Sequence, residues 1–256
     1  LLSELLSIPT FAEIESEMEN IDPLKIYKII DELNYLFGTK LKKELYFKLQ
    51  EIEKNLDKVW PEGKNERKLI ETIWKLLLHS NDEAIRRKIM FYVDSNSMTL
   101  AKAALNSFSR IDCPERQTIS NIFFNKWKNN SVVLDSWFSF NATIETHEKT
   151  SSIEKLFKNN FFDSKSPNTL RAILNTFVTR NSIFHAMDGS GYRYIAKKII
   201  DFDKLNPIVI SRFVKVFSRY NYYSDPYKSN MIETIKQIKK NKLSTNTKEV
   251  LDAIIE

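Results

Sequence analysis

Apolar residues recur along this chain at spacings of three and four, the period of an α-helix that buries one face. The pattern is clearest at 69–77, 85–93, 119–127 and 170–178, where aliphatic and aromatic side chains fall on one side of successive turns. No segment shows the strict alternation of apolar and polar residues that is typical of a half-buried strand. The sequence therefore predicts an all-α fold.

Proline marks several of the expected helix starts. A side-chain oxygen at the N-cap accepts a bond from a free backbone N–H, and proline at the first helical position has no N–H to leave unpaired. We expect Gly38 to interrupt the helix that begins at Asp22-Pro23. Four of the seven prolines follow Asp, Ser or Asn, at Asp22-Pro23, Ser166-Pro167, Asn206-Pro207 and Asp225-Pro226.

The expected architecture is a stack of helix pairs. The pattern indicates a dozen or more helices of roughly 8–16 residues with short connections, which favours antiparallel pairs lying side by side. This arrangement is an irregular α-solenoid, a superhelical stack with a shape like that of HEAT or armadillo proteins. No sequence repeat of fixed period supports a closer assignment.

Composition indicates an ordinary globular chain. Its 256 residues, 42% of them apolar, can bury the core of one large domain or of two small ones. No run approaches the roughly 18 apolar residues of a membrane span, so we expect no membrane partner. Cys113 is the only cysteine, which excludes an internal disulfide. That favours a reducing compartment, and we expect a cytoplasmic location.

The net charge of +6 raises the question of a phosphate-bearing partner. The excess is lysine, 29 against 10 arginines, and it is spread along the chain among many asparagines. This distribution indicates a compositional bias rather than a surface that reads nucleic acid. Nucleic-acid binding is therefore not favoured.

The histidines indicate no metal site. His147-Glu148 resembles the start of His-Glu-x-x-His, in which two imidazoles one helical turn apart bind zinc, but Ser151 stands at the second histidine position. We expect His79 to lie near a helix end, where it meets the C-terminal dipole without a functional role. No serine or cysteine stands in a recognisable nucleophile motif.

Two of the four glycines lie one residue apart in the segment Phe184-His185-Ala186-Met187-Asp188-Gly189-Ser190-Gly191-Tyr192. One interpretation is a structural corner: Asp188 or Ser190 caps the next helix, Gly189 is left-handed, and His185 bonds buried backbone. The other is a ligand loop. As a nucleotide cradle the Gly-x-Gly is weak, because it follows no strand and lacks a third glycine.

Basic residues form a row on one expected helix. Arg212, Lys215 and Arg219 are spaced by three and then four residues, so they share a face opposite the apolar side. This row is either a solvated outer face or part of a concave surface where arginine holds a carboxylate or a peptide carbonyl. Arg171, on the preceding proline-capped helix, could face the same hollow.

The glycine segment resembles the Phe-His-x-x-Asp-Gly-x-Gly-Tyr segment in the C-terminal helical domain of bacterial aminopeptidase N, the zinc-dependent alanyl aminopeptidase family. Other segments resemble that family in the same order, and together they span nearly the whole chain. They are Leu6-Ser7-Ile8-Pro9, Asn96-Ser97-Met98-Thr99, Lys126-Trp127, Leu134-Asp135-Ser136-Trp137-Phe138, Pro167-Asn168-Thr169-Leu170-Arg171 and Asn206-Pro207-Ile208-Val209-Ile210-Ser211-Arg212.

The resemblance implies that residues 1–256 are one domain of a longer enzyme, with 1–8 as the linker leading into it. The start at Leu1-Leu2, without methionine, agrees with a fragment. The parent would be an exopeptidase with one zinc ion that removes N-terminal residues from peptides. Its zinc motif and the Gly-x-Met-Glu-Asn segment belong to an upstream domain, so this fragment would neither bind zinc nor cleave peptides.

In this family the helical domain is a concave bowl that closes over the catalytic domain and limits access to peptides or flexible ends. By position, the resemblance implies that Arg171 and Arg212 line the chamber, and that Asn206 and Ile208 approach the substrate end. Ile208 departs from the polar residue expected there, so we expect no direct hydrogen bond from it.

The implied partners are the enzyme's own catalytic domain in cis and peptide substrates, and we expect a monomer. The alternative is a free-standing α-solenoid that binds a protein or a nucleic acid through a basic concave face. A gene product of roughly 850–900 residues with His-Glu-x-x-His upstream would favour the first hypothesis. A complete product of 256 residues would exclude it. Salt-dependent binding to DNA or RNA favours the second.

Overall fold

A computed structural model describes residues 2–56, 63–146 and 150–255. Within these ranges the regular secondary structure is helical, apart from an isolated β-bridge between Ile21 and Tyr223. The all-α fold predicted from the apolar spacing is confirmed. None of the helices found there combines the length and the apolarity needed to cross a membrane. The loop expected around Trp60-Pro61 lies outside the described residues.

The chain forms two compact units that interleave in sequence. Unit 1 contains Leu1–Thr10 and Lys28–Phe140, whereas unit 2 contains Phe11–Tyr27 and Asn141–Glu256. The long helix α3 (Pro23–Lys40) begins in unit 2 and continues in unit 1. Residues 11–27 must therefore find their partners in a part of the chain that follows more than a hundred residues later.

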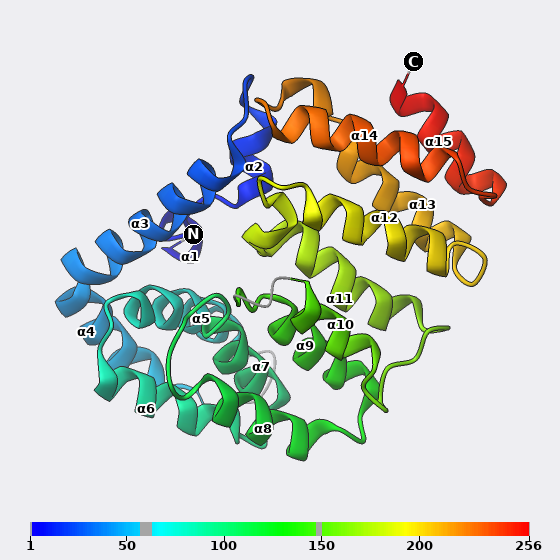
Figure 1. Cartoon of the computed structure of the whole chain (residues 1–256). Helices are drawn as coiled ribbons and strands as arrows, with labels where there is room; N and C mark the ends of the chain where they lie inside the picture. Colours follow the sequence, from blue (N-terminus) through cyan, green and yellow to red (C-terminus); the bar gives the residue numbers. More distant parts are fainter. Residues whose placement is uncertain (1, 57–62, 147–149, 256) are drawn as a thin grey trace. The chain divides into compact units, whose positions relative to one another are not determined.

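Unit 1 is a stack of helices around an apolar core. Its helix α5 packs against α4 and α7, and α6 packs against α7 and α8 (Figure 1). Trp74, Phe108 and Phe123 are fully buried at its centre. Besides most of α3, the helices are α1 (Leu2–Leu5), α4 (Lys42–Glu53), α5 (Lys64–His79), α6 (Glu83–Val93), α7 (Met98–Ser107), α8 (Arg116–Trp127) and most of α9 (Ser131–Ala142).

Unit 2 is a second helical stack, in which α12 packs against α13 and α14, and α13 packs against α15 (Figure 1). Its helices are α2 (Phe11–Ser16), α10 (Ser151–Phe157), α11 (Pro167–Arg180), the 3-10 turn η1 (Ser182–His185), α12 (Ser190–Phe202), α13 (Pro207–Val214), the 3-10 turns η2 (Lys215–Phe217) and η3 (Tyr220–Tyr222), α14 (Tyr227–Lys239) and α15 (Thr245–Ile255).

The two sequence segments of unit 2 are joined by hydrogen bonds near Ile21. The backbone N–H of Ile21 donates to the Tyr222 carbonyl at 2.6 Å, and the Ser224 N–H donates to the Ile21 carbonyl at 2.9 Å. Arg219 donates from Nη2 to the carbonyl of Glu15 at 3.1 Å, and the Tyr223 hydroxyl lies 3.0 Å from a carboxylate oxygen of the same Glu15. These bonds close unit 2.

The proline-marked helix starts are largely confirmed. Helices α3, α11 and α13 begin at the proline of their pair, and Ser166 accepts a bond from the backbone N–H of Thr169 at 3.3 Å. The fourth pair differs, because Pro226 occupies the N-cap and α14 begins one residue later at Tyr227. The Asp225 carboxylate accepts bonds from the backbone N–H and the hydroxyl of Ser229 instead.

Gly38 does not interrupt α3, so that prediction was wrong. The helix continues through it to Lys40, and Gly38 is buried where α3 passes the backbone of α5. A Cβ at this position would lie 2.0 Å from the Leu76 carbonyl oxygen, far inside van der Waals contact. The glycine is required by the close approach of two helix backbones rather than by a turn.

This close approach leads to a stability prediction. Replacing Gly38 by Ala improves helix propensity by about 1 kcal/mol. The added methyl group nonetheless meets backbone that cannot rotate away, so we expect a net destabilisation of about 1–3 kcal/mol in denaturant unfolding. Thr39→Ala, at the exposed neighbouring position of the same helix, is the control and should change stability little. A Gly38→Ala variant as stable as the wild type would contradict the prediction.

Candidate functional site

The glycine segment forms a corner in unit 2 between η1 and α12. Gly189 has a φ of +70°, as the structural interpretation expected, and its backbone N–H donates to the Ala186 carbonyl at 2.8 Å. Gly191 lies in the first turn of α12, pressed against the preceding 3-10 turn. A Cβ on Gly191 would lie 2.2 Å from the Phe184 carbonyl oxygen. The two glycines therefore meet different demands, left-handed backbone in one case and close packing in the other.

Asp188 orders the start of α12 from just outside the helix. Gly189 holds the N-cap position, and the Asp188 carboxylate accepts the backbone N–H of Ser190 at 2.9 Å. Of the two capping candidates, Asp188 thus makes the bond, and Ser190 is the first helical residue. The corner is also tied to α14, because the Asn230 side chain donates to the Met187 carbonyl at 2.9 Å.

His185 does not bond backbone, which corrects the expectation for this residue. Its Nδ1 lies 2.8 Å from the Tyr192 hydroxyl, across the corner on α12, and the imidazole is only 1% exposed. The Phe11 ring lies 5.0 Å from it and the Tyr223 ring stacks on it at 5.7 Å, both measured between centroids. Since the imidazole is enclosed by rings, a substrate cannot reach it.

Burial sets the protonation state of this pair. The apolar surroundings of His185 lower its pKa to about 3, because the imidazolium would lose its hydration without gaining a counter-ion. Its Nε2 has no hydrogen-bond partner among the described residues, so a second proton there would also lack an acceptor. Burial likewise raises the pKa of Tyr192. Both groups are neutral near pH 7 and act as packing elements with one shared hydrogen bond.

The two candidate arginines lie on helices that pack against each other. Arg171 is on α11 and Arg212 is on α13, and both side chains are exposed. Arg171 donates to the side-chain oxygen of Asn168 at 3.1 Å. Neither arginine forms an ion pair with the part of the chain that the structure describes. Two guanidinium groups without a carboxylate partner are suited to an anionic ligand.

Asn206 and Ile208 occupy the start of α13 with opposite environments. Asn206 is buried at the N-cap, and its amide group donates to the Ser164 carbonyl at 2.8 Å. Ile208 is 62% exposed and precedes Arg212 by four residues, so the two side chains share one face of α13. Ile208 and Arg212 therefore present an apolar and a cationic side chain to solvent side by side on α13.

The basic row expected on this helix is shorter than the spacing indicated. Helix α13 ends at Val214, and Lys215 begins a 3-10 turn that changes the direction of the following side chains. Arg219 turns to the Glu15 carbonyl, and its guanidinium lies 4.6 Å from the Tyr222 ring centroid. Only Arg212 and Lys215 remain exposed, so the prediction that all three share a face was wrong.

No cluster of three or more His, Cys, Asp and Glu side chains suited to a metal occurs within residues 2–56, 63–146 and 150–255. His147-Glu148 lies outside these ranges. His79 is in the last turn of α5, but burial lowers its pKa to about 4, with Lys75 and Arg110 adding to the effect. Burial thus outweighs the helix dipole that the sequence interpretation invoked.

An ion pair between a buried lysine and a half-buried glutamate in unit 2 was not predicted from the sequence. The Lys198 ammonium is 2.6 Å from the Glu154 carboxylate and 4.3 Å from the centroid of the Phe157 ring, and the Tyr194 hydroxyl donates to Glu154 at 3.0 Å. Burial opposes ionisation of Glu154, but the Lys198 bond and charge lower its pKa on balance. The sequence did contain a signal for it: Lys198 follows Ile195 by three residues and so lies on the apolar face of α12.

Known proteins show similarity along the full chain. A family model described as a domain of unknown function, DUF3458_C, with ARM repeats, matches residues 1–256. The chain is 27% identical to aminopeptidase N of Escherichia coli over 244 residues, 93% of this chain and 28% of that protein. It is 29% identical to aminopeptidase N of Haemophilus influenzae over 133 residues, 52% of this chain and 15% of that one.

A solved structure supports the fold. Aminopeptidase A of Legionella pneumophila in complex with aspartic acid matches with a TM-score of 0.86 and 24% identity, covering 99% of this chain and 31% of that one. The chain thus spans less than a third of the length of these relatives. Together the matches confirm the resemblance to the C-terminal helical domain of bacterial aminopeptidase N and the ARM-like helical stack.

The buried imidazole predicts a pH dependence of stability. The pKa of His185 is about 3 in the folded chain, against roughly 6.5 when unfolded. The contribution of neutral His185 to the free energy of unfolding is therefore complete above pH 6.5. It is lost as the pH falls towards 3, at about 1.4 kcal/mol per pH unit. Between pH 6.5 and 5, we expect the free energy of unfolding of His185→Gln to fall by about 2 kcal/mol less than that of the wild type.

Denaturant titrations across this pH range measure the effect. Tyr192→Phe is the matched control, because it removes the hydrogen bond but keeps the titrating ring. That variant should be less stable than the wild type at every pH and retain the slope. Equal slopes in the wild type and in His185→Gln would contradict the prediction.

Proposed function

Because this chain belongs to the DUF3458_C ARM-repeat domain family, we propose that it is the access-controlling C-terminal domain of a zinc-dependent aminopeptidase. In this proposal the domain performs no chemistry itself. It covers the chamber in which an upstream catalytic domain removes N-terminal residues from peptides. Confinement excludes bulk water and limits which chain ends can reach the reacting atoms. The lone free Cys113 agrees with a cytoplasmic enzyme.

The observation that carries this proposal is the exposed arginine pair. Arg171 and Arg212 project from two helices that pack together, and neither is neutralised by a carboxylate of the described chain. A peptide whose amino end is held at the catalytic centre presents carbonyl groups and, at its far end, a carboxylate. Guanidinium groups bind such oxygens through two parallel hydrogen bonds. The pair therefore supports a surface that faces the far end of a short peptide.

Ile208 and Asn206 have different parts in this proposal. Ile208, one turn before Arg212 and exposed, offers an apolar contact to a peptide side chain without a hydrogen bond. The amide group of Asn206 already donates to Ser164, so its contribution is to hold the start of α13 in place. The position of Arg212 then depends on this N-cap residue.

Zinc is assigned to the upstream domain. The relatives matched here are aminopeptidases, and the described residues of this chain bring together no three metal-binding side chains. In the family that the chain resembles, one zinc ion activates water and polarises the scissile carbonyl. This chain would contribute to that reaction by enclosing the substrate.

The arginine assignment is testable in the full-length protein. We expect Arg212→Ala to raise KM for di- to tetrapeptides by about tenfold, as expected for one charge-assisted hydrogen bond. An aminoacyl p-nitroanilide has no carboxylate at its far end, and its hydrolysis should not change. Steady-state kinetics with both substrate types measures the effect. Lys215→Ala, exposed three residues later, is the control. If neither kcat nor KM moves for any peptide length, Arg212 is only a surface residue.

The division of labour gives a second prediction. The chain by itself should not hydrolyse aminoacyl p-nitroanilides, with or without added zinc, because zinc and its ligands lie upstream in this proposal. The full-length protein should lose activity with a chelator and regain it with zinc. Initial rates of both proteins under the same conditions measure this. Hydrolysis by the isolated chain would refute the assignment of catalysis to the upstream part.

A further inference from the structure

A buried carboxylate stands where α12 ends. Asp203 is the C-cap of that helix, its backbone N–H donates to the Ile199 carbonyl at 3.0 Å, and the residue is only 1% exposed. The C-terminal end of a helix carries a partial negative charge, and a buried carboxylate has lost its hydration. Both effects disfavour an aspartate at this position. A contact from outside α12 must therefore compensate its charge.

The compensating contact is the start of α15. One oxygen of Asp203 accepts a bond from the backbone N–H of Ser244 at 2.5 Å, and the other accepts bonds from the Ser244 hydroxyl at 2.7 Å and from the Thr247 hydroxyl. The Ser244 hydroxyl in turn accepts the backbone N–H of Thr247 at 3.4 Å. Bonds to a charged acceptor are stronger than those between neutral groups, and the N-terminal end of α15 is positive. Asp203 thus anchors the first turn of α15.

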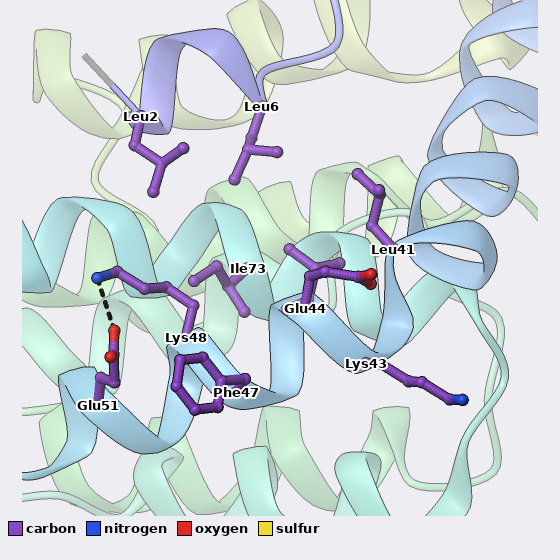
Figure 2. Close-up of a pocket in the computed structure, with 10 residues that line it drawn as sticks. Leu2, Leu6, Leu41, Lys43, Glu44, Phe47, Lys48, Glu51 and Ile73 are labelled. Carbon is purple, nitrogen blue, oxygen red and sulfur yellow. Dashed lines mark hydrogen bonds and ion pairs between the residues drawn. The ribbon is translucent and has the colours of Figure 1, made fainter.

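A second polar contact of α15 is weaker. Lys239 of α14 and Asp252 of α15 form an ion pair of 2.9 Å, with side chains 38% and 44% exposed. This exposure is similar to that of the Lys48–Glu51 pair on the surface of α4 (Figure 2). Exposed ion pairs are screened by water and salt and contribute little to stability. The position of α15 therefore depends on Asp203 and on apolar packing.

Helix α13 depends on α15 for its place. It has eight residues, and isolated helices shorter than roughly 12 residues are marginal in water, so packing decides where it lies. Helix α15 packs against both α13 and the 3-10 turn η2 that follows it (Figure 1). Ile210 and Val214 of α13 are buried, as is Leu251 of α15. Because Ile208 and Arg212 are carried by the same two turns of α13, a displacement of α15 also moves them.

The turn between α12 and α13 anchors α13 from two sides. Asp203 begins this turn and Asn206 ends it, and both side chains are buried. Asn206 donates to the Ser164 carbonyl in the segment before α11, whereas Asp203 binds the start of α15. Arg212 follows Asn206 by six residues, which is less than two helical turns. Its side chain therefore begins close to a turn that is bonded to two different parts of unit 2.

We propose that Asp203 is a positioning residue for peptide binding. It touches no substrate itself. By fixing α15 against α13, it sets where Arg212 stands relative to the carboxylate at the far end of a short peptide. This inference rests on the proposed function of the arginine pair and adds the residue that fixes its geometry. The substrates affected are peptides with a free C-terminal carboxylate, which a guanidinium group binds through two parallel hydrogen bonds.

The Asp203→Asn variant of the full-length protein tests this role. An amide has one accepting oxygen where a carboxylate has two, so part of the α15 anchor is lost. We expect KM for di- to tetrapeptides to rise by about fivefold with kcat unchanged, because a displaced binding group holds the peptide less tightly. Hydrolysis of an aminoacyl p-nitroanilide should not change. A mere loss of folded protein would instead lower the apparent kcat for both substrate types.

A double-mutant cycle with Arg212→Ala shows whether Asp203 acts through that arginine. We expect Asp203→Asn to raise KM in the wild-type background and to have no further effect when Arg212 is already alanine. Equal factors in the two backgrounds would overturn the proposal. An unchanged KM in Asp203→Asn, beside a raised KM in Arg212→Ala, would overturn it and leave the proposed function standing. An unchanged KM in Arg212→Ala would refute both.

Two further variants keep the test decisive if Asp203→Asn folds poorly. Thr247→Val preserves the shape of the side chain and removes one bond to Asp203, so KM should rise in the same direction by about twofold. Asp82→Asn is the matched control, because Asp82 caps α6 in unit 1 through the backbone N–H groups of Ala84 and Ile85. It should leave KM unchanged. A raised KM in Asp82→Asn, or an unchanged one in Thr247→Val, would count against the role of Asp203.

Discussion

Unit 2 depends on contacts between two segments of chain that are far apart in sequence. Glu15 meets Tyr223 across 208 positions, and the backbone of Ile21 pairs with that of Tyr222 and Ser224. Closing a loop of this length costs conformational entropy, although the cost grows only slowly with length. Burial of Ile21 and of the rings around His185 offsets it. These contacts fix residues 11–27 against the later segment of unit 2.

The corner at residues 184–192 belongs to the same closure. Phe11, from the early segment, lies against His185, which bonds Tyr192 at the start of α12. Both positions of the corner require glycine, Gly189 because its φ is positive and Gly191 because a Cβ would collide with the backbone of Phe184. Rigidity at this point fixes α12, and α12 packs on α13, which carries Arg212. A segment that resembled a ligand loop thus contributes to the candidate site by holding its scaffold.

Local chemistry made much of this fold predictable from sequence. Helix period and proline-linked caps depend on neighbours within a turn, and they identified the starts of α3, α11 and α13. Gly38 was misread because its demand comes from the backbone of α5, which no local pattern reveals. Arg219 was misplaced because α13 ends early and Glu15, two hundred residues away, provides its partner. The spacing of Arg212, Lys215 and Arg219 left a solvated face and a concave surface as alternatives, and only the family resemblance implied a chamber role for Arg171 and Arg212.

The interleaving of the two units has a consequence for synthesis of the chain. Residues 11–27 leave the ribosome with Phe11, Ile21 and Tyr27 exposed, and residues 222–224, which pair with Ile21, follow about two hundred positions later. At roughly 5–20 residues per second, these side chains wait on the order of 10 to 40 s for that partner. Unit 1 can mature during this interval, whereas unit 2 is completed only after residues 222–224 have been synthesised. Residues 11–27 thus remain without their native partners throughout this interval, with their apolar side chains exposed to other parts of the nascent chain.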